Sequence, residues 1–141
     1  MAEEQKIAGI YVIAVDDEPV PLKILTNVYS PRIEDGNFHQ ATCYEEALEL
    51  LQKLDKENKY HPRFWIIDGL NGKWRDLAGD IEQVHGNDCI VIYSGDRGEE
   101  ARVAGFKTLD KPSRVQPMID ALLDYRTDLQ KRGLLNIEES V

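Results

Sequence analysis

The sequence predicts an α/β protein built on a doubly wound, five-stranded parallel sheet. Short apolar segments alternate along the chain with longer segments whose apolar residues recur at helical spacing. The best apolar segments are continuous, which is typical of strands covered by helices on both faces. Strands separated by helices pair in parallel through right-handed crossovers. At 141 residues, 42% of them apolar, the chain is long enough for one such domain and too short for two.

Five segments are predicted to be strands. Residues 10–15 form a continuous apolar run rich in β-branched side chains, and residues 63–67 and 89–93 have the same character. Residues 38–44 form a weaker strand after a turn, and residues 106–109 form a short one. Cys43 and Cys89, the two cysteines, both fall within these predicted strands.

Five further segments are predicted to be helices, at residues 19–29, 45–56, 73–85, 99–104 and 113–131. In the first, Val20, Ile24 and Val28 are spaced to form one apolar face, behind prolines that suit a first helical turn. The fourth helix is short, with about two turns between flanking glycines. We expect a core domain at residues 10–132, an N-terminal extension at 1–9 and a C-terminal tail at 133–141.

Composition argues against several classes of protein. The 26 acidic and 17 basic residues give a formal charge of -9, and no basic block occurs, which disfavours direct binding to nucleic acid. Cys43 and Cys89 do not form a C-x-x-C pair, so buried free thiols are expected. No apolar run approaches the roughly 20 residues that cross a bilayer, and residues 1–9 lack a signal-peptide pattern. We therefore expect a soluble, cytoplasmic protein without membrane contacts.

The residues with chemical potential come at the ends of the predicted strands. Asp16 and Asp17 follow the first strand, Asp68 the third and Ser94 the fourth, and Lys111 comes just past the fifth. Taken singly, each is explained by a polar loop or a helix cap. The carboxyl ends of parallel strands converge on one edge of a sheet, however, so these side chains should meet there. An acidic pocket with a single ammonium is a suitable site for a divalent cation and a phosphoryl group.

This pattern resembles the receiver (CheY-like) domain of bacterial two-component response regulators, over residues 10–132. The matching pieces, in the family's order, are Val15-Asp16-Asp17-Glu18, Ile66-Ile67-Asp68, Ile92-Tyr93-Ser94-Gly95 and Asp110-Lys111-Pro112. Each piece alone is a weak signal, whereas the ordered set is specific. The resemblance implies a flavodoxin-like sheet with strand order 2-1-3-4-5.

The resemblance also implies a role for each matching residue. Asp68 would be the phosphoacceptor, Asp16 and Asp17 would hold Mg²⁺ (or Mn²⁺) with it, and Leu70 would offer the metal its backbone carbonyl. The remaining members of the implied set are Ser94 as the hydroxyl switch, Gly95 beside the acyl phosphate and Lys111 as the phosphate-binding cation. The implied partners are a histidine kinase or histidine phosphotransfer protein and a downstream protein target. Oligomeric state is not implied.

The chain departs from the family at positions that modulate the site. Residues 69–74 read GLNGKW in place of the usual Met-Pro and later Asp-Gly, and Thr108 stands where an aromatic residue commonly acts as a switch. Leu70 and Asp96 occupy the two variable positions that flank the site. Because Leu70 cannot hydrogen-bond an attacking water, we expect slow hydrolysis of the acyl phosphate. Leu70→Asn should then speed the loss of phosphate in a timed assay, and an unchanged rate would contradict this expectation.

Two alternative functions fit the sequence less well than a receiver. A phosphatase of the haloacid-dehalogenase type also uses an Asp nucleophile and Mg²⁺, but it needs its nucleophile after the first strand and further acids beyond the lysine. Asp120 and Asp124, which follow the lysine, fall within a predicted helix instead. A pseudo-receiver, a binding module that has lost phosphorylation, is disfavoured by the complete residue set. The three histidines, His39, His61 and His85, lack the spacing of a metal site.

Overall fold

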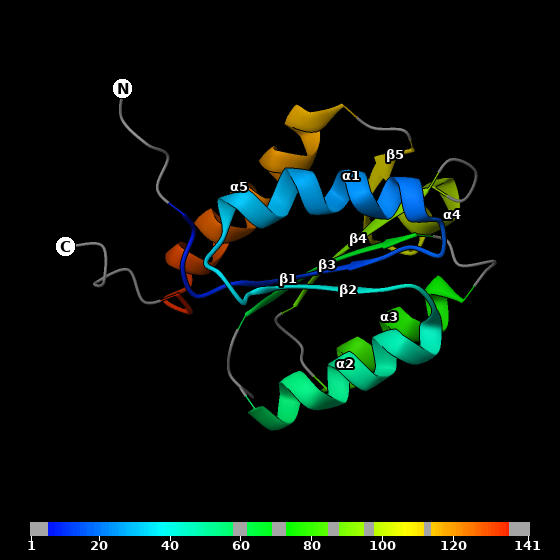
Figure 1. The fold of residues 1–141 in the computed structure, drawn as a ribbon, viewed down its shortest axis with the longest axis horizontal. Coiled ribbons are helices and arrows are strands. Elements are labelled where there is room, and N and C mark those ends of the chain that lie inside the picture. Colours follow the sequence, from blue (N-terminus) through cyan, green and yellow to red (C-terminus); the bar gives the residue numbers. More distant parts are fainter. Residues whose placement is uncertain are drawn as a thin grey trace.

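The structure is a computed structural model that describes residues 6–57, 62–68, 73–84, 88–94, 98–111 and 114–135. One parallel sheet, in the order β2-β1-β3-β4-β5, lies between two layers of helices (Figure 1). Its strands are β1 (Tyr11–Val15), β2 (Phe38–Ala41), β3 (Arg63–Asp68), β4 (Cys89–Ser94) and β5 (Lys107–Asp110). The helices are α1 (Pro19–Tyr29), α2 (Tyr44–Glu57), α3 (Trp74–Val84), α4 (Gly98–Val103) and α5 (Val115–Lys131), with a 3₁₀ turn at Ser30–Arg32. The predicted doubly wound sheet and its strand order are confirmed.

The strand register brings the carboxyl ends of four strands to one edge of the sheet. Val15 of β1 lies beside Ile67 of β3, and Asp68 lies beside Tyr93 of β4. Ser94 at the end of β4 lies beside Asp110 at the end of β5. The residue that follows each of these strands therefore enters the same region of the molecule.

Each face of the sheet has its own apolar core, because successive strand side chains point to opposite faces. Val12 and Ala14 of β1 pack with residues of α1 and α5 on one face. Ile13 and Val15 pack with residues of α2, α3 and α4 on the other face. The two layers are visible above and below the sheet in Figure 1. Trp65 and Trp74 are both buried in the second core.

The buried face of α1 is not the one predicted. Val20 is 69% exposed and Ile24 41% exposed, so the predicted apolar stripe is largely a surface feature. Leu22 and Leu25 instead face the sheet, together with Val28. The helix carries two overlapping apolar stripes, and the larger leucines occupy the core. As a result, two apolar side chains lie on the surface of the helix that begins at the functional edge.

The segment after β2 also differs from the prediction. β2 ends at Ala41, where a strand over residues 38–44 was expected. The backbone N–H and Oγ1 of Thr42 both donate to Glu46 Oε1, at 2.6 and 2.8 Å. These bonds start α2 at Tyr44, so Cys43 lies half-buried in the connection and not in a strand.

The packed part of the protein begins before β1. Ile7, within the expected N-terminal extension, is buried and forms a bridge with Ile33, so packed structure begins before residue 10. None of the helices in the described part of the chain combines the length and apolar character needed to cross a bilayer.

Candidate functional site

Asp16 is fixed by the turn that joins β1 to α1. Its side chain is fully buried, and its Oδ1 accepts a hydrogen bond of 2.9 Å from the backbone N–H of Glu18. Such a bond from a residue to the N–H two positions later is typical of Asp in a turn. Glu18 itself has extended backbone angles and is followed by Pro19, which begins α1. The turn leaves Asp16 Oδ2 directed into the site.

Lys111, just past β5, joins the ends of three strands through its ammonium group. Nζ donates to Asp68 Oδ1 at 2.7 Å and to Asp16 Oδ2 at 3.0 Å. A third bond of 3.2 Å reaches Glu18 Oε1. The ammonium also lies 5.6 Å from the centre of the Tyr93 ring, within the range of a cation–π contact. Residues separated by up to 95 positions in sequence therefore share one charged centre.

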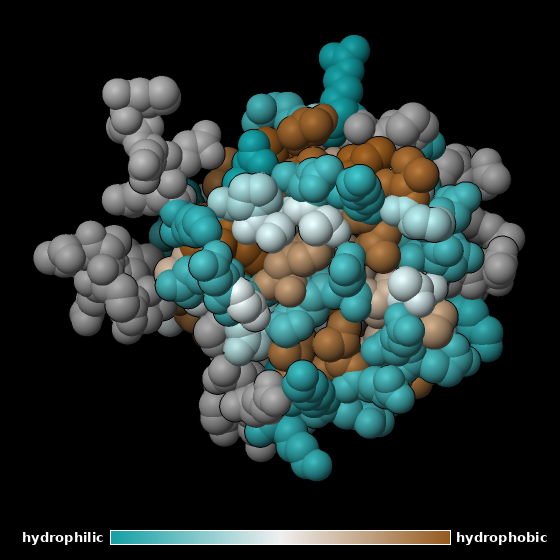
Figure 2. All heavy atoms as spheres, in the orientation of Figure 1, coloured by the Kyte–Doolittle hydropathy of each residue, from teal (hydrophilic) through white to brown (hydrophobic). Residues whose placement is uncertain are grey.

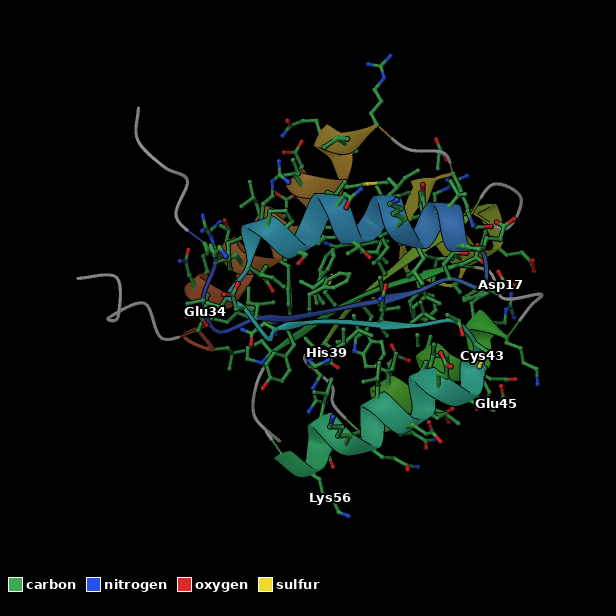
Figure 3. The ribbon with its side chains drawn as sticks, viewed as in Figure 1. Asp17, Glu34, His39, Cys43, Glu45 and Lys56 are labelled. Carbon is green, nitrogen blue, oxygen red and sulfur yellow. The ribbon has the colours of Figure 1, made fainter. Side chains whose placement is uncertain are left out.

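Asp16, Asp17 and Asp68 form an acidic group open at one side. One carboxylate oxygen of each lies within 4.8 Å of the others. Asp16 is buried, Asp68 half-buried and Asp17 exposed, so the group extends from the interior to the surface. Asp17 marks its position in Figure 3, beyond the end of β1. Hard oxygen ligands with room left for water suit Mg²⁺, so this donor set fits a magnesium or manganese ion.

The electrostatics of the site favour an added positive charge. Burial raises the pKa of Asp16 above its ordinary value of 3.8, and the charge of Asp68 adds to the effect. The pKa of Asp17 is also raised, by desolvation and then by Asp68. Burial alone would lower the pKa of Lys111, but its bonds to Asp68 and Asp16 outweigh burial and raise it. Lys111 is therefore a permanent cation, whereas the carboxylates repel one another.

Ser94 and Thr108 lie near this group on the last two strands. Ser94 ends β4 with its side chain buried, one strand away from Asp68. Thr108, on β5, is half-buried, and its Oγ1 lies 3.5 Å from Arg102 Nη1 on α4. The other residues of the expected set, Leu70, Gly95 and Asp96, lie outside the described residues, as does Pro112. The predicted roles of all these residues stay predictions.

The fourth carboxylate, that of Glu18, is absent from the set predicted from the sequence. It directly follows the aspartate pair, and the turn at Asp16 directs it back to Lys111. Its adjacency to Asp16-Asp17 was the available signal. The contact of its side chain with Lys111 depends on the turn at Asp16, which the sequence does not reveal. Among the described residues, no other group of three His, Cys, Asp or Glu side chains is spaced to hold a metal ion. His39 instead makes an edge-to-face contact with Tyr11.

A groove of about 420 Å³ runs from this acidic group along α1 towards β2. Asp16, Asp17 and Glu18 line one end of it. Farther along, the hydroxyl of Thr26 donates to Gln40 Oε1 at 3.2 Å, which joins α1 to the edge strand. The acidic group is therefore accessible from solvent on the α1 side.

Comparison with known proteins supports a specific fold. No protein-family model matches the chain, and no curated protein sequence matches it. Among solved structures, it is similar to the signal receiver domain of an HD domain-containing protein from Pseudomonas fluorescens Pf-5. The match has a TM-score of 0.69 at 19% identity and covers 96% of this chain and 97% of that one.

This chain has the fold of a signal receiver domain. At this identity the likeness establishes the fold alone, and it agrees with the family resemblance seen in the sequence. Function has to be inferred from the site.

Proposed function

We propose that the protein is a cytoplasmic response regulator receiver that accepts a phosphoryl group on Asp68. The donor is a phosphohistidine on a histidine kinase or phosphotransfer protein, and the output is a conformational switch read by another protein. One observation carries the proposal: Lys111 Nζ lies 2.7 Å from Asp68 Oδ1 and 3.0 Å from Asp16 Oδ2, beside Asp17, on a receiver fold. In this role the protein is a phosphoacceptor and not an enzyme with turnover.

Asp16, Asp17 and Asp68 would hold the divalent cation, with the backbone carbonyl of Leu70 as a further ligand. Their oxygens lie close enough to share one ion, and their mutual repulsion is relieved by it. When bound, Mg²⁺ supplies positive charge against the oxygens of the transferring phosphoryl group. Mn²⁺ has the same preference for oxygen ligands and is an alternative.

Asp68 acts as the nucleophile of the transfer. A carboxylate oxygen of Asp68 forms a bond to phosphorus while the phosphorus–nitrogen bond of the donor breaks, and its electron pair stays on the imidazole nitrogen. Little covalent assistance is needed for such a transfer, because in-line positioning and charge neutralisation do most of the work. Lys111 contributes by moving from Asp68 Oδ1 to an oxygen of the incoming group, which is a short displacement for a flexible side chain.

The switch would operate at the ends of β4 and β5. A phosphorylated Asp68 presents new acceptor oxygens, which the Ser94 hydroxyl and the Lys111 ammonium can bind. Those bonds would draw the end of β4, and Gly95 beyond it, towards Asp68. The result is a population shift between two conformations, biased by one covalent group. Thr108 is not aromatic, so the output cannot depend on the movement of an aromatic side chain at this position.

A protein donor needs a surface beside Asp68, and α1 provides one. Val20 and Ile24 are exposed on the helix that starts two residues after Asp17. Hydrophobic atoms gather along the upper edge of the face in Figure 2, where Figure 1 shows α1 and α5. We expect Val20→Ser to slow transfer from a phosphohistidine protein and to leave transfer from acetyl phosphate unchanged.

A small phosphodonor tests the function. With acetyl phosphate and Mg²⁺, intact mass spectrometry should show one added phosphoryl group on the wild type and none on Asp68→Asn. Repeated turnover with release of phosphate would indicate a phosphatase instead. No adduct under any condition would indicate a phosphorylation-independent module. Either result would contradict the proposed function.

A further inference from the structure

Glu18 contacts the catalytic ammonium without belonging to the cation-binding group. Its Oε1 accepts a 3.2 Å hydrogen bond from Lys111 Nζ, while its side chain remains 65% exposed. Its backbone N–H is bound to Asp16, so the start of the side chain is fixed at the mouth of the site. Glu18 also lines the groove through which the acidic group is accessible.

Glu18 changes the net charge of the site when a divalent cation is bound. Asp16, Asp17 and Asp68 together carry three negative charges, which a divalent cation and Lys111 neutralise. Glu18 leaves one negative charge in excess. It also holds the ammonium that an incoming phosphoryl group requires, so the donor must compete with Glu18 for Lys111.

Resting on the function proposed above, we propose that Glu18 is a specificity-determining residue that selects phosphodonors by charge. A donor that reaches Asp68 comes close to this uncompensated carboxylate, because Glu18 and Asp68 both accept a hydrogen bond from the Lys111 ammonium. The repulsion grows with the number of negative charges that the donor brings. Small dianionic acyl phosphates are therefore disfavoured relative to a donor with a smaller net negative charge, such as phosphoramidate.

Coulomb's law gives the size of the effect. Because Lys111 Nζ lies 3.2 Å from Glu18 Oε1 and 2.7 Å from Asp68 Oδ1, these two oxygens are at most about 6 Å apart. In water-like surroundings at that distance, removing one charge speeds the reaction of a dianion about tenfold and that of a monoanion about threefold. Salt reduces both effects, because charges near the surface are screened.

The experiment compares two donors on the full-length protein with saturating Mg²⁺ at low ionic strength and neutral pH. Acetyl phosphate is the dianion and phosphoramidate the monoanion. The variants are Glu18→Gln and Glu18→Ala, with Glu45→Gln as the control. Glu45 is an exposed acid in the first turn of α2, at the same end of the molecule as Asp17 (Figure 3). Melting temperatures establish that each variant is folded.

We expect the rate of phosphorylation of both Glu18 variants to increase more with acetyl phosphate than with phosphoramidate. The Glu45 variant should be phosphorylated at the same rate as the wild type by both donors. Equal increases in rate with both donors, or no increase, would overturn the role of Glu18. If the wild type is still phosphorylated, the proposed receiver function would be unaffected by that result. If no variant and no wild-type sample is phosphorylated by either donor, both proposals fail.

Discussion

The two ends of the sheet use polar groups in opposite ways. At the amino end of β3, the buried Trp65 donates its indole N–H to Asp88 Oδ2 at 2.9 Å, so a neutral donor satisfies an acid. At the carboxyl end of the same strand, Asp68 shares one ammonium with Asp16 and Glu18, next to Asp17. The first arrangement pairs one acid with one neutral donor. The second concentrates like charges and is completed only by an added cation.

The carboxyl end of the sheet gives up stability for function. Raised pKa values at Asp16 and Asp17 mean that the folded state disfavours their charged forms. The amino end and the two apolar cores provide the stability that offsets this repulsion. Substitutions at the two ends should therefore change stability in different ways.

The largest effect is expected from removing the ammonium at the carboxyl end. Lys111→Met leaves Asp16 and Asp68 without their shared partner, which should cost about 3 kcal/mol at neutral pH, as for other broken, largely buried ion pairs. The loss should shrink in acidic solution, because the pKa of Asp16 is raised by burial and its carboxylate takes up a proton as the pH falls. Urea unfolding at neutral and at acidic pH measures this, with the exposed Lys107→Met on β5 as the control. Equal losses for the two variants would remove the distinction between the ends of the sheet.

A smaller effect, without dependence on metal, is expected at the amino end. Trp65→Phe removes the indole N–H from Asp88 and should cost about 2 kcal/mol, from the lost hydrogen bond and the reduced volume. The stabilisation that Mg²⁺ gives the protein should remain as in the wild type. Thermal melts with and without Mg²⁺ provide the measurement. A loss of the Mg²⁺ effect would show that the two ends are coupled.

The smallest effect should have the opposite sign. Because the pKa of Asp17 is raised above its ordinary 3.8, through desolvation and Asp68, the folded state binds this proton more tightly than the unfolded chain. The stabilisation that protonated Asp17 gives the folded state is therefore lost as the pH rises from about 3.8 through the raised pKa. Asp17→Asn should therefore stabilise the metal-free protein at neutral pH, by less than about 1 kcal/mol because Asp17 is exposed.

Two further observations sharpen this prediction. The gain from Asp17→Asn should disappear below about pH 3.8, where Asp17 is protonated in both states. It should also reverse when Mg²⁺ is added, since the variant lacks a ligand and the wild type gains binding free energy. Asp124→Asn on α5 is the matched exposed control. A destabilised, metal-free Asp17→Asn would contradict the proposed repulsion.

Much of the fold and the positions of the main site residues could be predicted from the sequence. The apolar runs that became β1, β3 and β4 are continuous, and Asp16, Asp68 and Ser94 stand where they end. Parallel pairing then leaves one edge on which such residues can meet. The meeting of Asp16, Asp17, Asp68 and Lys111 follows from strand order more than from any detail of packing.

The remainder depended on competition that the sequence does not resolve. In α1, two apolar stripes at helical spacing were available, and the sheet selected Leu22 and Leu25 over Val20 and Ile24. After β2, the bonds from Thr42 to Glu46 ended the strand early, although the apolar pattern continued. The hydrogen bond from the Glu18 N–H to Asp16 directs Glu18 towards Lys111. This bond belongs to a three-residue turn, which has no repeating pattern that could be read from the sequence.

The most direct test of the central claim is to map the phosphorylated residue. The wild type and Asp68→Asn are treated with acetyl phosphate with Mg²⁺ or with EDTA, the acyl phosphate is reduced with borohydride, and peptides are sequenced by mass spectrometry. We predict that the modification falls on Asp68 alone, requires Mg²⁺ and is absent from the variant. Modification at Asp16 or Asp17 in the wild type would contradict the role of Asp68 as the acceptor, and modification of Asp68 in the presence of EDTA would contradict the requirement for Mg²⁺.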